Sequence, residues 1–134
     1  MVIRATKIVA QQDSLRYTRP MAVASEQVTR VKVRRVAEAF GGQAEVARLL
    51  RLHRSRISRW LAGEEPDPRN KARLDALEFV LARLLQTFEL STARKWLSAT
   101  NAHLGNRRPL DLMARNRLAE VIAAIEQADL DSYA

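Results

Sequence analysis

Two short helical patterns joined by a tight connection constrain the fold of this chain more than any other feature. The patterns cover residues 43–50 and 54–61, and each places apolar residues at the spacing of a helix with one buried face. Ala47 is small where two helices must cross closely, and Leu52 is apolar where the connection must fill the core. The segment therefore predicts two short helices that pack tightly against each other.

Helical patterns also extend along most of the remaining sequence. Aromatic residues make up only 5% of the 134 residues, and glycine and proline number 4 each, a composition that favours helices over a β-sandwich or barrel. The acidic tail after residue 128 is expected to be mobile. The predicted fold class is all-α, with further helices at residues 26–40 (capped by Ser25), 68–88 (capped by Asp67), 91–98 (capped by Ser91 or Thr92), 109–113 and 116–128.

Positive charge is concentrated in the N-terminal part of the chain. The net charge is +8, to which residues 1–40 contribute +5, residues 41–75 contribute +3 and residues 76–134 contribute nothing. This distribution suits a polyanion such as DNA, although a solvated basic surface would have the same composition. Residues 1–24 lack a helical period and predict a flexible or extended arm, which could follow a DNA backbone.

Composition excludes several classes of function. The chain has no cysteine and only two histidines, His53 and His103, so neither a disulfide framework nor a multi-histidine metal site can form within one chain. No acid–base pair, nucleophile elbow or glycine-rich phosphate loop is present, so we expect no enzyme and no cofactor. No apolar run approaches the ~18 residues of a membrane span, and the N-terminus is not a secretory signal. These features predict a cytoplasmic protein.

The long helix predicted at residues 68–88 carries more apolar surface than a small domain needs. Phe79 and Val80 widen a stripe that already contains several leucines and ends at Phe88. A partner helix could cover part of this stripe, and so could the core of the same chain. The first possibility predicts a homodimer.

The two-helix pattern resembles the Xre/Cro family of helix-turn-helix repressors. The resemblance covers residues 28–75 and rests on Gln43-x-x-Val46-Ala47-x-x-Leu50, then Arg54-Ser55-x-Ile57-Ser58-Arg59, then Gly63. Two residues depart from the family pattern. Arg51 stands where the turn usually has glycine, and His53 stands where the second helix usually has a serine or threonine cap.

This resemblance implies that the second helix reads operator DNA in the major groove. By the family pattern, Arg54, Ser55 and Arg59 lie where base edges are read, and Gln43 lies where phosphate is contacted. Arginine pairs bidentately with guanine, which suits this helix, and dimeric repressors place two such helices about one DNA turn apart. The full candidate set for DNA is Gln43, His53, Arg54, Ser55, Arg56, Ser58 and Arg59.

The C-terminal half is similar to the Xre/MbcA/ParS toxin-binding domain. The family pattern W-L-x-x-x-N-x-x-L-G-x-x-x-P-x-D-L is present in full, from Trp96-Leu97 through Asn101, Leu104-Gly105 and Pro109 to Asp111-Leu112. With this second resemblance, the expected organisation is an arm (1–24), an Xre/Cro-like helix-turn-helix bundle (25–75) and a small helical toxin-binding domain (76–134).

Family members with these two modules are antitoxins of type II toxin–antitoxin systems. The resemblance implies a RES-domain toxin that consumes NAD⁺ as partner, repression of the shared operon, and a C-terminal end that approaches the NAD pocket of the toxin. The candidate toxin-binding residues are Asn101, Arg107, Arg108, Asp129, Leu130, Asp131, Ser132, Tyr133 and Ala134. Asp111 is expected either to cap a helix or to pair with Arg107 or Arg108.

Two other interpretations remain open at this point. A stand-alone repressor would explain residues 28–75 equally well but would leave the pattern at 96–112 without a role. A ParS-like adaptor that binds protein and has lost its DNA contacts would explain the C-terminal half, but the arginines of the second helix argue against it.

Overall fold

Helices and short connections make up the part of the chain that the structure, a computed structural model, describes. This part is residues 19–133, with side chains described from residue 27 onward, and the basic residues expected in the arm before Arg19 lie outside it. The prediction of an all-α fold is confirmed. The elements are α2 (Arg19–Phe40), α3 (Gln43–Leu50), α4 (Arg54–Leu61), α5 (Pro68–Thr87), α6 (Leu90–Ser98), the short 3₁₀ helix η1 (Ala102–Leu104), α7 (Pro109–Ala114) and α8 (Leu118–Ser132).

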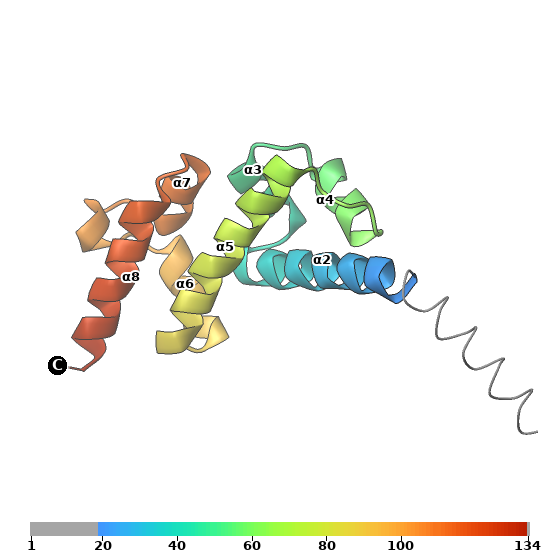
Figure 1. Cartoon of the computed structure of the whole chain (residues 1–134). Helices are drawn as coiled ribbons and strands as arrows, with labels where there is room; N and C mark the ends of the chain where they lie inside the picture. The colour runs from blue at the N-terminus through green and yellow to red at the C-terminus, as the bar shows by residue number, and fades with distance from the viewer. Residues whose placement is uncertain (1–18, 134) are drawn as a thin grey trace, which may run out of the picture.

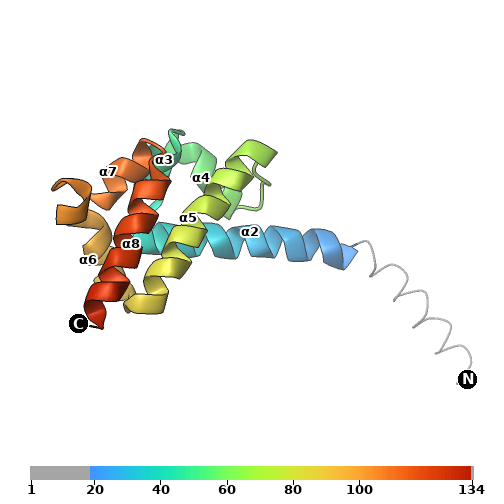
Figure 2. The same cartoon turned by 60° about the vertical axis from the view of Figure 1, so that its left-hand side comes forward.

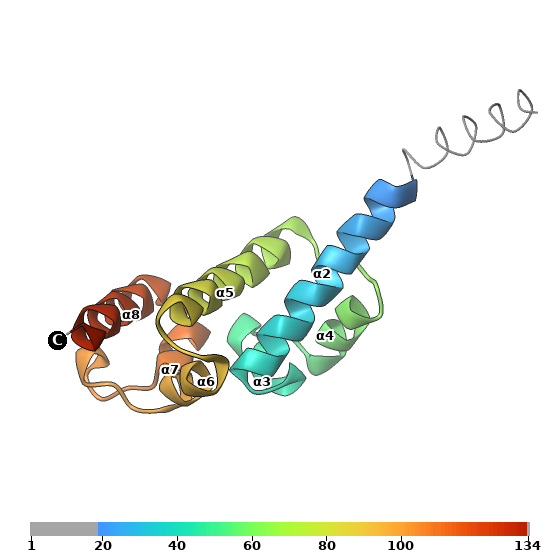
Figure 3. The ribbon, with the colours of Figure 1, turned by 90° about the horizontal axis from the view of Figure 1, so that it is seen from below.

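The helices pack around one long central helix, α5. It contacts α2 on one side and α8 on the other, and α6 and α3 also pack against it (Figure 1). The beginning of α2 and the end of α8 lie at opposite ends of the molecule, which remains evident after a turn of the view (Figure 2). From below, α8, α5 and α2 follow one another across the molecule, with α7, α6, α3 and α4 beneath them in that view (Figure 3).

One hydrophobic core extends through all of these elements. It includes Val46 and Leu50 of α3, Ile57 and Trp60 of α4, and Leu97 of α6, each at most 2% exposed. Burial of apolar side chains of this size stabilises a fold by about 1.5–3 kcal/mol for each residue. The division expected at residues 75 and 76 falls inside α5, where Leu74 and Leu77 are both buried in this core.

The two-helix unit forms with the predicted bounds. Its turn accommodates Arg51 at the position where the family pattern usually has glycine. Arg51 follows α3 in the left-handed conformation, with φ of 55° and ψ of 45°, which is the conformation that glycine favours at this position. The Arg51 Nε donates a hydrogen bond of 3.3 Å to the carbonyl oxygen of Ala114 in α7. Leu52 fills the turn in a half-buried position beside the core.

Several expected helix ends are wrong. α2 begins at Arg19, so residues 19–24 are helical and not extended, and Ser25, the expected cap, lies within the helix. Pro20 is compatible with this because a first-turn residue needs no N–H donor within the helix. α6 begins one residue before the expected caps, with Glu89 at its N-cap. α8 continues to Ser132, so the acidic tail is helical where we expected mobility.

Candidate functional site

The residues proposed for DNA lie together on α4 and the start of α3, and we call them the recognition surface: Gln43, His53, Arg54, Ser55, Arg56, Ser58 and Arg59. His53, Arg54, Ser55, Ser58 and Arg59 are exposed, whereas Gln43 and Arg56 are half-buried. This exposure follows from the sequence, because Ile57 and Trp60 occupy the opposite face of α4 and are buried in the core. The helix thus presents a polar, arginine-rich face outward.

Hydrogen bonds fix the geometry of the recognition surface. The Ser58 hydroxyl donates to Gln43 Oε1 over 2.9 Å, which joins α4 to the start of α3. His53 caps α4, since its Nδ1 accepts a hydrogen bond of 3.3 Å from the Ser55 backbone N–H. Arg59 forms an ion pair of 3.4 Å with Glu64, whereas no carboxylate of the described residues lies within 4.0 Å of the Arg54 guanidinium. Arg54 is therefore available to an external anion.

The end of α4 is supported from α2. The Arg30 Nη2 donates a hydrogen bond of 3.1 Å to the carbonyl oxygen of Ala62, just after the last residue of α4. The Thr29 hydroxyl donates to a carboxylate oxygen of Glu65 over 3.2 Å. Through these contacts, α2 holds both the end of α4 and the segment that follows it. The recognition surface is thereby fixed against the rest of the fold.

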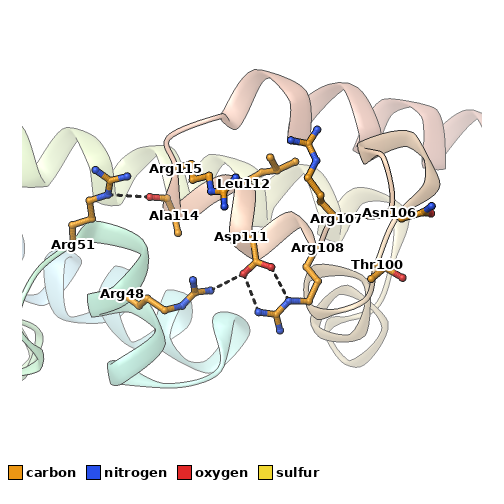
Figure 4. Close-up of a pocket in the computed structure, with 10 residues that line it drawn as sticks. All are labelled: Arg48, Arg51, Thr100, Asn106, Arg107, Arg108, Asp111, Leu112, Ala114 and Arg115. Atoms are coloured by element: carbon orange, nitrogen blue, oxygen red, sulfur yellow. Dashed lines mark hydrogen bonds and ion pairs between the residues drawn. The ribbon is translucent and has the colours of Figure 1, made fainter.

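A second site, not predicted from the sequence, lies between α3 and α7 (Figure 4). It is a hollow of about 660 Å³ that we call the arginine hollow, and the sole carboxylate in its lining belongs to Asp111. Its arginines come from the two-helix unit and from the C-terminal segment, and are Arg48, Arg51, Arg107, Arg108 and Arg115. Of these, the sequence pattern selects only Arg107 and Arg108 as candidate site residues.

Asp111 organises the charges in the arginine hollow. Its carboxylate accepts hydrogen bonds from Arg108 Nε at 3.0 Å and Arg108 Nη2 at 2.9 Å, and forms an ion pair of 3.5 Å with Arg48 Nη2. The hydrogen bond from Arg108, aided by the charges of both arginines, lowers the pKa of the Asp111 carboxyl below its ordinary value. Asp111 thus pairs with Arg108 and not with Arg107, which instead contacts Glu120 of α8 at 3.4 Å.

The C-terminal end of α8 forms a third candidate site. Leu130 is 65% exposed and Tyr133 is 84% exposed, the two largest values among the exposed large hydrophobic side chains of the described residues. Two elements contact this end of α8. Thr87 of α5 donates a hydrogen bond of 2.7 Å to Asp129, and His103 of η1 lies 3.6 Å from Asp131. The structure therefore places Asp129–Tyr133 as a projecting helical end.

The candidate toxin-binding residues fall into two groups. Arg107 and Arg108 line the arginine hollow, while residues 129–133 lie at the end of α8, and Ala134 lies outside the described residues. Asn101 belongs to the connecting loop, where its backbone N–H donates to the Arg107 carbonyl oxygen over 3.1 Å and its side chain accepts from the His103 N–H over 2.9 Å. A structural role in the loop thus accounts for Asn101.

The described residues contain neither a candidate membrane-spanning helix nor a candidate cluster of metal ligands. From residue 19 to 133, no helix is both long and apolar enough to cross a membrane. Within the same range, no three histidine or acidic side chains gather in a way that could hold a metal ion.

Comparisons with known proteins identify the C-terminal half. Residues 83–128 match the family model described as the antitoxin Xre/MbcA/ParS C-terminal toxin-binding domain. The chain is also similar to a chain of the crystal structure of the M. tuberculosis MbcT–MbcA toxin–antitoxin complex, with 27% sequence identity and a TM-score of 0.64. That match covers 76% of this chain and 94% of the other. A search of curated proteins finds no match.

The matched range begins in α5 and ends in α8, and it contains the loop that the W-L…D-L pattern builds. The structural match extends well beyond this range, since it covers three quarters of the chain. The family model, matched by sequence, and the solved structure, matched by fold, indicate the same family. Together they support an antitoxin of the Xre/MbcA/ParS family, with the match to its toxin-binding domain at residues 83–128.

Proposed function

We propose that this antitoxin binds operator DNA through the recognition surface and represses transcription of its own operon. The observation that carries this proposal is the outward face of α4, where Arg54, Ser55 and Ser58 are exposed beside Gln43 at the start of α3. A guanidinium with no carboxylate neighbour among the described residues, as at Arg54, can form a bidentate contact with guanine. Contacts of Gln43 and His53 with the phosphate backbone of the DNA would fix the register of α4 on the duplex.

Two copies of the recognition surface would be needed for tight operator binding. Phe79 of α5 is 57% exposed and Leu85 is 37% exposed, so the side of the long helix that faces away from the core is partly apolar. We propose that a second copy covers this side in a homodimer, which would present two α4 helices to two half-sites.

Variants of the recognition surface test DNA binding. The chain would first select a duplex from a random DNA library, and its affinity for that duplex and for a scrambled one would be compared. Arg54→Gln should lower discrimination between the two duplexes by about 1–3 kcal/mol. Arg83→Gln, which removes one half-buried charge of α5 outside the recognition surface, is the control and should leave discrimination unchanged. Equal affinity of the wild-type chain for both duplexes would contradict operator binding.

We propose that the protein partner is a RES-domain toxin that degrades NAD⁺, and that the two meet in the cytoplasm. Two findings support a toxin partner. The matched family model is described as a toxin-binding domain, and the similar solved structure is named a toxin–antitoxin complex. The RES class follows from the sequence resemblance of residues 96–112, and the same resemblance suggests that the C-terminal end of the antitoxin blocks the NAD pocket.

The projecting end of α8 is the element that we propose to enter that pocket. Leu130 and Tyr133 supply exposed apolar and aromatic surface, and Asp129 and Asp131 supply negative charge that basic pyrophosphate-binding residues would attract. Asp129 is held by Thr87, so the end of the helix is preorganised, which lowers the entropy cost of binding.

Co-expression with the neighbouring toxin gene tests both parts of the proposal. Growth and cellular NAD⁺ should collapse with the toxin alone and recover with the full antitoxin. A chain that ends at Asp129 keeps the hydrogen bond with Thr87, so it isolates the role of residues 130–134. If that chain still binds the toxin but no longer restores NAD⁺, the end of α8 acts as the blocking element. Full protection by the shortened chain would contradict this role.

A further inference from the structure

The arginine hollow continues into a second hollow along the same side of the molecule. The second hollow has a volume of about 680 Å³ and shares Arg51, Ala114 and Arg115 with the first. It extends to the beginning of α5, where Arg69 and Arg73 line it. Together the two hollows form one basic groove, lined by Arg48, Arg51, Arg69, Arg73, Arg107, Arg108 and Arg115.

The positive charge of this groove is only partly neutralised. Asp67 and Asp111 are the only carboxylates among its lining residues. Asp67 accepts a hydrogen bond from the Asn70 backbone N–H, and Asp111 is shared between two arginines. Within the described residues, no carboxylate lies within 4.0 Å of the guanidinium groups of Arg69 and Arg115, which are both exposed. The groove thus holds charge for an external anion.

We propose that this groove binds the phosphate backbone of the DNA that flanks the site read by the recognition surface. The inference rests on the proposed DNA binding and names a second contact surface for the same ligand. It places C-terminal residues that the sequence resemblance assigned to a toxin, Arg107 and Arg108, on the nucleic acid. The footprint of the protein on DNA is then longer than a two-helix unit alone would give.

Continuity with the recognition surface is the first argument. Arg51 lies two residues before His53, the cap of α4, so the groove begins in the turn of the two-helix unit. From the start of α3, consecutive ion pairs lead into the groove: Glu45 with Arg48 at 2.5 Å, Arg48 with Asp111 at 3.5 Å, and Asp111 with Arg108 at 2.9 Å. Beyond these paired charges the groove contains Arg115 and Arg69, so a duplex held at Gln43 can meet unneutralised positive charge as it continues past α3.

The chemistry of the lining is the second argument. Protein interfaces have an apolar centre with aromatic anchors and few charges, whereas the groove contains no aromatic residue and only small or isolated apolar side chains such as Leu52 and Leu112. Its neutral members include Thr100, Asn106 and Asn116, which are donors of the kind that bind phosphate oxygens. Charge spread over two adjoining hollows also suits a linear polyanion better than one small anion.

The experiment compares long and short forms of the selected duplex with wild-type and Arg69→Gln/Arg115→Gln protein. Both substituted side chains are exposed, so the variant should keep the thermal stability of the wild type. Removing the flanks of the duplex should weaken wild-type binding, and it should weaken binding by the variant less, because the variant lacks two of the groove's arginines. On the long duplex, the plot of log affinity against log salt concentration should become shallower by about 0.9 for each phosphate that the variant no longer neutralises.

Control measurements separate this inference from the proposed function. Arg83→Gln removes a charge outside the groove and should keep the wild-type dependence on flank length. If wild type and variant respond equally to flank removal, the groove does not bind DNA, even though the recognition surface does. If the wild type selects no duplex, the proposed DNA binding itself is wrong. If the variant instead loses toxin binding with its DNA affinity intact, the groove serves a protein and our inference fails.

Discussion

The carboxylate of Asp111 on α7 and the guanidinium of Arg48 on α3 form an ion pair of 3.5 Å. This contact connects the two-helix unit to the segment that carries the toxin-binding family pattern. Because Asp111 also accepts two hydrogen bonds from Arg108, its charge holds an arginine from each part of the chain in place. The pair is partly solvent-exposed, so its effect on stability is modest and depends on pH.

Asp111→Asn should therefore destabilise the protein in a pH-dependent way. The folded-state pKa of Asp111 is lowered by its hydrogen bond with Arg108, so the stabilisation is fully present above the ordinary aspartate pKa of about 3.9. It is lost as pH falls from there through the folded-state pKa. Urea unfolding at several pH values should show a gap between wild type and variant at pH 7 that narrows below about pH 4. A gap of constant size would show that the charge of Asp111 is not its cause.

His53 is an uncommon but functional cap for α4. Its Nδ1 accepts a hydrogen bond from the Ser55 N–H, so His53→Ala should cost about 1 kcal/mol of unfolding free energy. Asparagine is among the best residues at this position, and His53→Asn should be at least as stable as the wild type. Chemical unfolding of the two variants measures both effects. Equal losses in the alanine and asparagine variants would exclude capping as the role of His53.

An exposed apolar side chain on α5 provides a test of the proposed homodimer. Phe79 is 57% exposed, and Phe79→Glu would place a charge in any interface that covers it, which costs several kcal/mol when the charge is buried without a partner. Light scattering should then show a dimer for the wild type and a monomer for the variant. Ala123→Glu adds the same charge to an exposed position of α8 and should remain dimeric. A dimeric Phe79→Glu protein would place the interface elsewhere.

Local patterns were sufficient to predict much of this fold. The bounds of the two-helix unit and the start of α5 agree with the structure, because glycine, proline and Asp67 act within a few residues of where they stand. The end of α8 could not be predicted in this way. Asp129 is held by Thr87, a residue 42 positions earlier, and this long-range contact supports the helix where its own acidic residues suggest fraying.

The recognition surface and the arginine hollow also differ in how far the sequence alone predicts them. Arg54, Ser55 and Ser58 could be placed on one exposed face from helical spacing alone. The arginine hollow could not, because Arg48 and Arg115 are far apart in the sequence and meet only where α7 packs against α3. A partial signal was present in the spacing of Arg48 and Arg51, which are both exposed, the first on α3 and the second in the turn that follows it.

The left-handed conformation of Arg51 predicts an unusual order of stability for two substitutions. A side chain with a Cβ costs roughly 1–2 kcal/mol in this conformation, whereas glycine adopts it without strain. Arg51→Gly and Arg51→Ala both remove the hydrogen bond to Ala114, so their difference reports the backbone alone. The glycine variant should be more stable than the alanine variant by about 1 kcal/mol in urea unfolding. The reverse order would show that the turn relaxes to another conformation when the arginine is removed.

The packing of α6 can be tested with two leucines of that helix that differ in burial. Leu97 is fully buried and Leu90 is 36% exposed. Leu97→Ala leaves a cavity in a close-packed region and should cost about 2–5 kcal/mol of unfolding free energy. Leu90→Ala removes the same atoms from the surface and should cost less than about 1 kcal/mol. Similar losses in both variants, measured by urea unfolding, would mean that α6 is not anchored through Leu97.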